Sequence, residues 1–146
     1  MVGSGEDGDH QCGDIGKMNV LRTGIDLIEV NRLGSQKPEI RERFIERVYT
    51  ESERAYCGDN PQHLAGRFAA KEAVSKALGC GIGDVDWQEI EILNDASGAP
   101  VLTLRGRAAE RAAREGLTLW SVSITHVKEM AAACAVAMGE KPEGRS

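Results

Sequence analysis

The sequence predicts an α+β domain in which antiparallel strands pack with one long central helix. A helical segment over 64–79 is rich in Ala, Leu, Lys and Glu, contains no proline and ends at a glycine. Residues 87–93 and 100–104 alternate as strands around a short turn, which is typical of a hairpin. The expected order of strand, helices, two strands, helix and two strands differs from the regular alternation of a parallel βαβ protein.

The N-terminal half is expected to hold one strand followed by helices. Residues 19–30 are β-branched and aliphatic, so they predict a strand that passes into a helix around 27–33. The S/T-x-x-E pattern at 50–53 is a capping box and predicts a short helix that runs to about Cys57. Pro61 suits the first turn of the central helix, since its missing N–H is not needed there.

The central helix carries two groups of side chains on opposite sides. A helical wheel places one narrow apolar arc on Ala70, Ala73, Val74, Ala77 and Leu78, and the other side on Phe68, Lys71, Glu72, Ser75 and Lys76. Glu72 and Lys76 lie one turn apart on a rigid support, as a functional pair would. They also fit a solvated i,i+4 ion pair worth about 0.3–0.5 kcal/mol.

The C-terminal half has one segment with two possible structures. Residues 106–116 predict a surface helix rich in Ala, Arg and Glu, and 119–125 predict a strand with Trp120, Val122 and Ile124 on one face. Residues 130–138 (MAAACAVAM) favour a helix by propensity, yet their place after a strand and a short polar turn fits the second strand of a hairpin equally well.

Composition places the 146 residues in one domain, expected over 18–139. Residues 1–17 are expected to be a disordered acidic, Gly-rich extension and 140–146 a flexible tail. The extension contributes much of the net charge of −5, so the body is close to neutral, which argues against a nucleic-acid partner. The chain has no apolar run long enough for a membrane span or a signal peptide, and its four cysteines are scattered, so we expect a cytoplasmic protein.

Asp26 is the most unusual residue of the first half, because Ile25 and Leu27 flank it. A carboxylate in an apolar run is costly to bury unless it is hydrogen-bonded or bound to a cation. The sequence alone is equally consistent with a second role for Asp26, as the N-cap of the helix that follows.

Three blocks of the sequence now stand in order. They are Gly24-Ile25-Asp26-Leu27, the central block from Leu64 to Lys76 (LAGRFAAKEAVSK), and Val122-Ser-Ile-Thr-His126 followed by Ala131–Ala133. Together they resemble the holo-[acyl-carrier-protein] synthases, the short class of 4′-phosphopantetheinyl transferases. The resemblance covers about 18–138, and its central block is highly specific.

The resemblance implies a metal site and a reaction. Asp26 and Glu72 match the family's ligands for Mg²⁺, which would bind the pyrophosphate of coenzyme A while a serine of the carrier protein attacks and 3′,5′-ADP leaves. Glu72 and Lys76 would be the catalytic residues, and the serine proton would pass to Glu72 or to a water on the metal. Contacts to coenzyme A are implied for Arg67, Lys71, Lys76 and His126.

The resemblance also implies partners. The longer transferases of this superfamily join two such halves in one chain, so a chain of this length is expected to form a homotrimer with coenzyme A between subunits. A basic surface with Arg32, Arg41 and Arg43 is expected to dock the acidic acyl carrier protein, in fatty acid biosynthesis.

Two other functions share some of these features. Another Mg²⁺-dependent phosphoryl-group enzyme acting on a nucleotide would also use Asp26, Glu72 and Lys76. A non-catalytic module that binds coenzyme A or a carrier is the second, although binding alone needs cations rather than two acids in the site.

Overall fold

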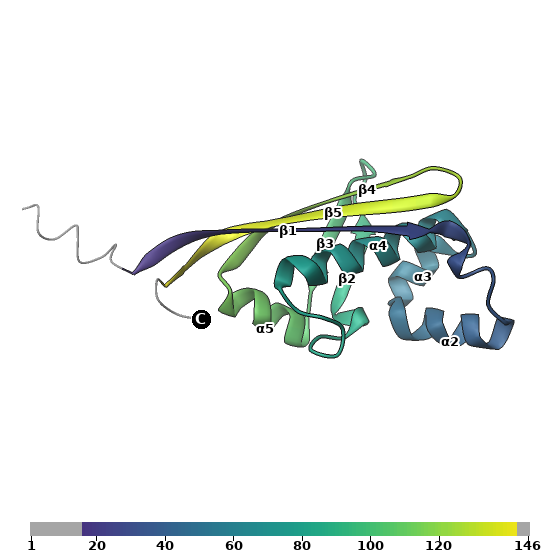
Figure 1. Cartoon of the computed structure of the whole chain (residues 1–146), viewed down its shortest axis with the longest axis horizontal. Coiled ribbons are helices and arrows are strands. Elements are labelled where there is room, and N and C mark those ends of the chain that lie inside the picture. The colour runs from purple at the N-terminus through teal and green to yellow at the C-terminus, as the bar shows by residue number, and fades with distance from the viewer. Residues whose placement is uncertain (1–15, 143–146) are drawn as a thin grey trace, which may run out of the picture.

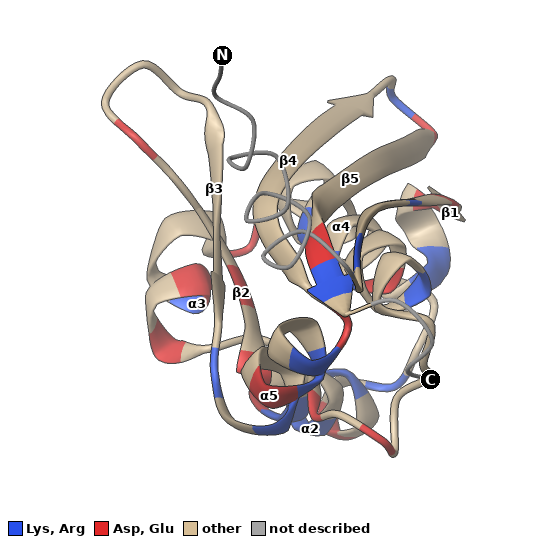
Figure 2. Ribbon diagram, turned by 90° about the vertical axis from the view of Figure 1, so that its left-hand side faces the viewer, with Lys and Arg blue, Asp and Glu red and all other residues tan. Residues whose placement is uncertain are grey.

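The computed structural model describes residues 16–142 and places one helix, α4, at the centre of the molecule (Figures 1 and 2). A three-stranded sheet covers one side of α4, and a hairpin with the shorter helices covers the other. The elements are β1 (Lys17–Glu29), the 3₁₀-helix η1 (Val30–Arg32), α2 (Pro38–Val48), α3 (Glu51–Cys57), α4 (Pro61–Leu78), the 3₁₀-helix η2 (Trp87–Glu89), β2 (Ile90–Asn94), β3 (Pro100–Leu104), α5 (Gly106–Arg114), β4 (Leu117–His126) and β5 (Met130–Pro142). The α+β prediction is confirmed.

The larger sheet has the strand order β1-β5-β4 and is antiparallel throughout. Its middle strand, β5, contains the segment whose sequence fits both a helix and a strand. Hydrogen-bonded ladders on both edges outweigh the helix propensity of its alanines. The small side chains that alternate along β5 are buried toward α4: Ala131, Ala133, Ala135 and Ala137. β5 also runs past the predicted domain boundary at 139.

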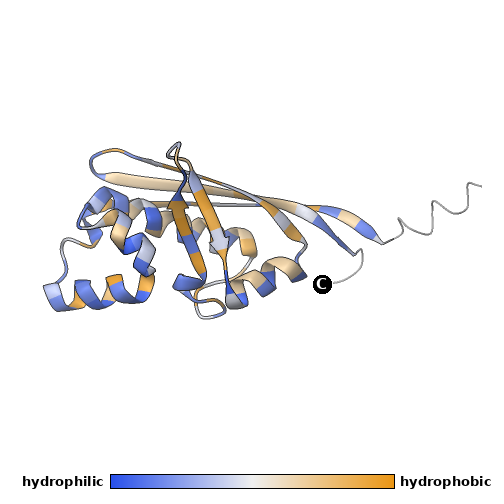
Figure 3. Ribbon diagram, turned by 180° about the vertical axis from the view of Figure 1, so that it is seen from behind, coloured by the Kyte–Doolittle hydropathy of each residue, from blue (hydrophilic) through white to orange (hydrophobic). Residues whose placement is uncertain are grey.

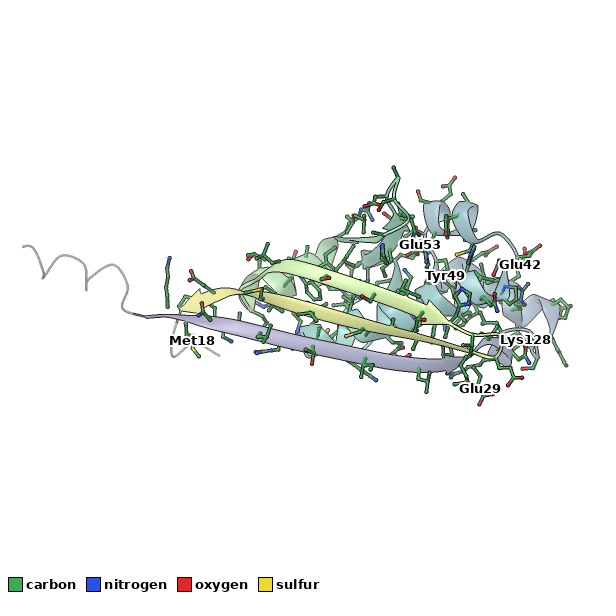
Figure 4. All side chains as sticks on the ribbon, turned by 90° about the horizontal axis from the view of Figure 1, so that it is seen from above. Met18, Glu29, Glu42, Tyr49, Glu53 and Lys128 are labelled. Atoms are coloured by element: carbon green, nitrogen blue, oxygen red, sulfur yellow. The ribbon has the colours of Figure 1, made fainter. Side chains whose placement is uncertain are left out.

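β1 is longer than the sequence predicts. It stays paired with β5 as far as Glu29, opposite Met130, and the helix expected around 27–33 is only the single turn η1. The end of β1 lies beside the β4–β5 hairpin, where Glu29 and Lys128 are neighbours in Figure 4 and the Val30 N–H donates to the carbonyl of Glu129 at 2.8 Å. Asp26 is therefore inside a strand, which excludes the N-cap alternative.

β1 and α4 approach each other closely at Gly24. A Cβ added at Gly24 would overlap the carbonyl oxygen of Ala73 on α4, so only glycine allows this backbone contact. Gly66 makes a similar but looser approach to β4, since its added Cβ would lie 2.9 Å from Cγ2 of Ile124. These contacts set the distance between the sheet and the central helix.

α4 is buried on nearly all sides, which corrects the prediction of one narrow apolar arc. Phe68, Lys71 and Ser75, placed on the polar side by the helical wheel, are also buried because the second layer covers them. The apolar β2–β3 hairpin is part of this layer (Figure 3), and Phe68 packs against Phe44 and Trp87 with ring centroids 5.5 and 5.0 Å away. Such a helix needs both layers to be stable in water.

The helix ends follow the sequence closely. Thr50 and Glu53 form the predicted capping box of α3, and the Asn60 side chain caps α4 by accepting from the N–H of His63 at 2.9 Å. Gly79 ends α4 in the left-handed conformation that favours glycine. The strand predicted from Trp87 begins only at Ile90, after the turn η2.

Two of the predicted termini fall largely outside the described residues. These are the acidic extension over 1–17, of which Gly16 and Lys17 are described, and the tail over 140–146, of which 140–142 belong to β5. Within 16–142, none of the helices is long and apolar enough to cross a membrane.

Replacing Gly24 tests the contact between β1 and α4. We expect Gly24→Ala to lower the free energy of unfolding by about 3 kcal/mol, because the added methyl group pushes the strand off the helix. Urea unfolding at a fixed protein concentration measures the change. Gly81→Ala is the control, since its Cβ meets no atom within 4 Å. A loss below about 1 kcal/mol in Gly24→Ala would contradict the close contact.

Candidate active site

Asp26 and Lys76 meet where β1 crosses α4. Asp26 lies two residues after Gly24 and so on the same inner face of the sheet. The Lys76 ammonium group donates to the carbonyl of Ile25 at 2.8 Å and lies 3.4 Å from Oδ1 of Asp26. The Lys76 side chain is half exposed, so its charge is available to a bound anion.

Glu72 joins this pair from one turn earlier on α4. Partial burial raises the pKa of Glu72, and the charge of Asp26 raises it further, while Lys76 and Arg32 act in the opposite direction. The two carboxylates are thus close enough to repel each other. The structure thus brings together Asp26, Glu72 and Lys76. Asp26 precedes Glu72 by 46 residues in the chain, and Glu72 precedes Lys76 by four.

The carboxylate pair fits a hard divalent cation. Mg²⁺ prefers oxygen ligands and is usually held by one or two carboxylates together with substrate phosphates and water. Asp26 and Glu72 supply that number, and a bound cation would offset the partial burial and the charge of Asp26, which together raise the pKa of Glu72. Within 16–142 no group of three or more His, Cys, Asp or Glu side chains could form an all-protein cage. Two carboxylates suit a metal whose other ligands are substrate phosphates and water.

Lys71 lies apart from this site, although it directly precedes Glu72. Its ammonium group is fully buried on the opposite side of α4, 2.7 Å from Oε1 of Glu53. It also donates to the carbonyls of Trp87 and Ile90, at 2.9 and 2.6 Å. All three donors are used inside the protein, so the expected contact between Lys71 and coenzyme A does not fit the structure. The reason is that successive helical residues point 100° apart.

Arg67 lies on α4 in a second cluster, which includes an aromatic pair. Its guanidinium carbon is 4.5 Å from the ring centroid of Tyr56, and the Tyr56 ring stacks on His63 with centroids 5.1 Å apart. Nε and Nη2 of Arg67 are buried without a hydrogen-bond partner among the described residues. Burial lowers the pKa of His63, and the charges of Arg67 and His126 lower it further. This cluster is suited to an anion.

His126 lies on the same inner face of the sheet as Asp26, and its charge acts on His63. It lies at the end of β4, on the same face as Ile124, and the β5 residue Ala133 pairs with both Ile124 and Asp26.

Sequence reasoning missed Tyr56 and His63. His63 precedes Arg67 by four residues on α4, so helical spacing could have placed them on one face, whereas Tyr56 is on a different helix.

The three arginines expected at the carrier surface occupy different environments. Arg32 ends η1, with its guanidinium carbon 6.0 Å from the Phe68 ring centroid, and its charge acts on Glu72. Arg41 and Arg43 are on α2. Arg41 lines a groove of about 790 Å³ between α2, α3 and the start of α4, and Arg43 is exposed beside Ile40. Acidic residues alternate with the arginines on this helix.

A family model described as the 4′-phosphopantetheinyl transferase superfamily matches residues 22–136. The chain belongs to this superfamily. The match spans all three sequence blocks and every residue of both clusters.

Relatives and solved structures cover most of the transferase chain. It is 44% identical over 127 residues to the holo-[acyl-carrier-protein] synthase of Herpetosiphon aurantiacus, which covers 82% of this chain and 100% of the relative. The Helicobacter pylori synthase in complex with coenzyme A has a TM-score of 0.71 and 33% identity, over 79% of this chain and 98% of that one. The Bacillus anthracis synthase, in complex with coenzyme A (3′,5′-ADP), has a TM-score of 0.67 and 35% identity, over 84% and 99%.

Proposed function

We propose that this transferase is a holo-[acyl-carrier-protein] synthase, which moves the 4′-phosphopantetheine group of coenzyme A to a serine of an apo acyl carrier protein and releases 3′,5′-ADP. The observation that carries the proposal is the convergence of Asp26, Glu72 and Lys76 at the crossing of β1 and α4. The names of its relatives and the coenzyme A found in their structures support the same reaction.

Each residue of the site has a separate task in this reaction. Asp26 and Glu72 hold Mg²⁺, which supplies Lewis-acid activation of the pyrophosphate when it is bound. Lys76 neutralises the negative charge that grows on the leaving 3′,5′-ADP, since its half-exposed ammonium group lies beside both carboxylates. Arg67 and His126 bind the phosphates of the nucleotide, and Nε and Nη2 of Arg67, which have no hydrogen-bond partner within 16–142, support this role.

A homotrimer is the second part of the proposal, and the outer face of the large sheet supports it. Leu21, Met138 and Leu119 form a row across β1, β5 and β4, and all three are exposed. Ile25 and Leu27 extend this apolar surface along β1, with about two thirds of each side chain exposed. An apolar face of this kind marks a contact with another protein surface, here a second copy of the chain.

An acidic carrier protein is the macromolecular substrate, docked on α2 and η1 through Arg32, Arg41 and Arg43. Because Arg32 also acts on Glu72, it links the docking surface to the catalytic residues.

We place the reaction in the cytoplasm, where the free thiols of Cys57, Cys80 and Cys134 remain reduced.

Neutralising either carboxylate tests the metal site. We expect Asp26→Asn and Glu72→Gln each to lower transfer at least a hundredfold, about 2.7 kcal/mol in the barrier, with an unchanged circular dichroism spectrum. Mass spectrometry of the carrier protein measures transfer, and the product must be 3′,5′-ADP. A chelator should abolish wild-type transfer, and Mg²⁺ should restore it. Glu29→Gln, on the exposed end of β1, is the control. Transfer within tenfold of wild type in either variant contradicts the site.

Reversing the charge of Arg43 tests carrier docking. We expect Arg43→Glu to raise the KM for the carrier about tenfold at low salt and to leave the KM for coenzyme A unchanged, because surface charges act through screened attraction. Arg32→Glu should change both constants, since Arg32 also acts on Glu72. Arg114→Glu, an equal charge change on α5, is the control. An unchanged carrier KM in Arg43→Glu removes this residue from the docking surface.

A charge on the outer sheet face tests the trimer. We expect Leu21→Glu to convert the trimer to a monomer and to lower transfer at least tenfold, because a carboxylate cannot be buried there without a partner. Light scattering gives the mass and an assay at the same concentration gives the activity. Val101→Glu, on an exposed position of β3, should change neither. A fully active monomer would rule out active sites shared between subunits.

A further inference from the structure

We infer that the buried ion pair between Lys71 and Glu53 positions Glu72 and Lys76 for transfer. The inference rests on the catalytic roles proposed above for those two residues. Lys71 and Glu72 are adjacent on α4, so the side chain that contacts the second layer and the side chain that faces Asp26 share one stretch of backbone. Whatever sets the rotation of α4 about its axis at Lys71 also sets the direction of Glu72.

The ion pair is fully satisfied by groups from three other elements. Lys71 donates to Glu53 on α3, to the carbonyl of Trp87 on η2 and to the carbonyl of Ile90 at the start of β2. Glu53 in turn accepts from the N–H of Ile92 on β2 at 2.7 Å and from the N–H of Thr50 at 2.9 Å. Charged hydrogen bonds are directional and short, so they define one orientation where apolar packing would allow several.

The pair acts from the side of α4 opposite to the sheet. Gly24 contacts the backbone at Ala73 on the sheet side and fixes the distance between β1 and α4. Ala73, at this contact, has a small side chain that offers little to oppose a rotation of the helix, and the ion pair on the opposite side of α4 adds this restraint. A rotation of about 20° would move a side-chain atom about 6 Å from the helix axis by about 2 Å. Displacements of about 1 Å in an active site can lower rates about a hundredfold.

Stability alone is a weak explanation for this pair. Removing two charges from water is costly, and well-packed uncharged replacements of buried ion pairs are often neutral or stabilising. Breaking the pair by removing one partner leaves an uncompensated buried charge and is strongly destabilising. Replacing both residues therefore separates a role in stability from a role in positioning α4. The double substitution removes the directional contact without leaving a lone charge.

The test compares Lys71→Met/Glu53→Gln with the wild type. The Met side chain fills the volume of the lysine stem, and Gln keeps an oxygen that accepts from the backbone. Three quantities are measured: the melting temperature, the affinity for coenzyme A by calorimetry, and the single-turnover rate of transfer with saturating Mg²⁺ and carrier. We expect a folded protein with coenzyme A affinity within threefold of wild type and a transfer rate at least tenfold lower, since misplaced groups act mainly in the transition state.

Two further variants keep the test decisive. Lys141→Met removes the ion pair that joins the end of β5 to Glu115, 3.2 Å long, while Arg22 still pairs with Glu115, and it should leave the transfer rate unchanged. Glu53→Asp keeps both charges and shortens the reach by one methylene, so it should also slow transfer, measured well below its melting temperature. It replaces the double variant if that protein does not fold.

A folded Lys71→Met/Glu53→Gln protein, or Glu53→Asp in its place, that transfers within twofold of the wild-type rate overturns the inference. Affinity and rate that fall together, in proportion to the folded fraction, also overturn it, because the pair is then only structural. Glu72→Gln distinguishes this outcome from a failure of the proposed site. If Glu72→Gln is inactive while the pair variants are active, only the positioning role is wrong; if Glu72→Gln is active, the site itself is wrong.

Discussion

The contact between Gly24 on β1 and the backbone of Ala73 on α4 is the constraint on which the site depends. A strand and a helix can approach this closely only where neither carries a side chain between them, and the alanines of β5 continue the same close packing beside it. Asp26 follows two residues later on the same face, while Glu72 and Lys76 flank Ala73 on the helix. The carboxylate pair is thus a direct consequence of how near the backbones come.

The same packing explains why α4 needs support on its other side. Small side chains bury little apolar area per residue, so the stability of the core depends on covering α4 from all directions. The second layer does this with Phe44 and Trp87, which pack on Phe68, and with Glu53, which pairs with Lys71. The outer sheet face stays apolar and exposed, and a second copy of the chain would cover it. The candidate carboxylate Asp26 and the exposed apolar row therefore lie on opposite faces of one sheet.

Much of the fold and site was open to prediction because the signals are local. The capping box at Thr50, the terminating Gly79 and the alternation after Trp87 all act within a few residues. The resemblance singled out Asp26, Glu72 and Lys76, which the structure brings together. The contact expected between Lys71 and coenzyme A does not fit the structure, because a layer formed by distant segments buries this lysine. Tyr56 was missed for the same reason, since its contact with Arg67 joins two helices.

The sequence by itself determined the α+β order, the helix ends and the chemical identity of the candidate ligands, since each depends on residue type and short spacing. The tertiary structure alone decided that 130–138 is a strand, that Asp26 lies within a strand, and which face of α4 each lysine occupies. The physical reason is that sheet pairing and burial are long-range interactions. The ladders of β5 and the covering of α4 form only when segments far apart in the chain meet, and their combined free energy exceeds the local preferences of an alanine-rich segment.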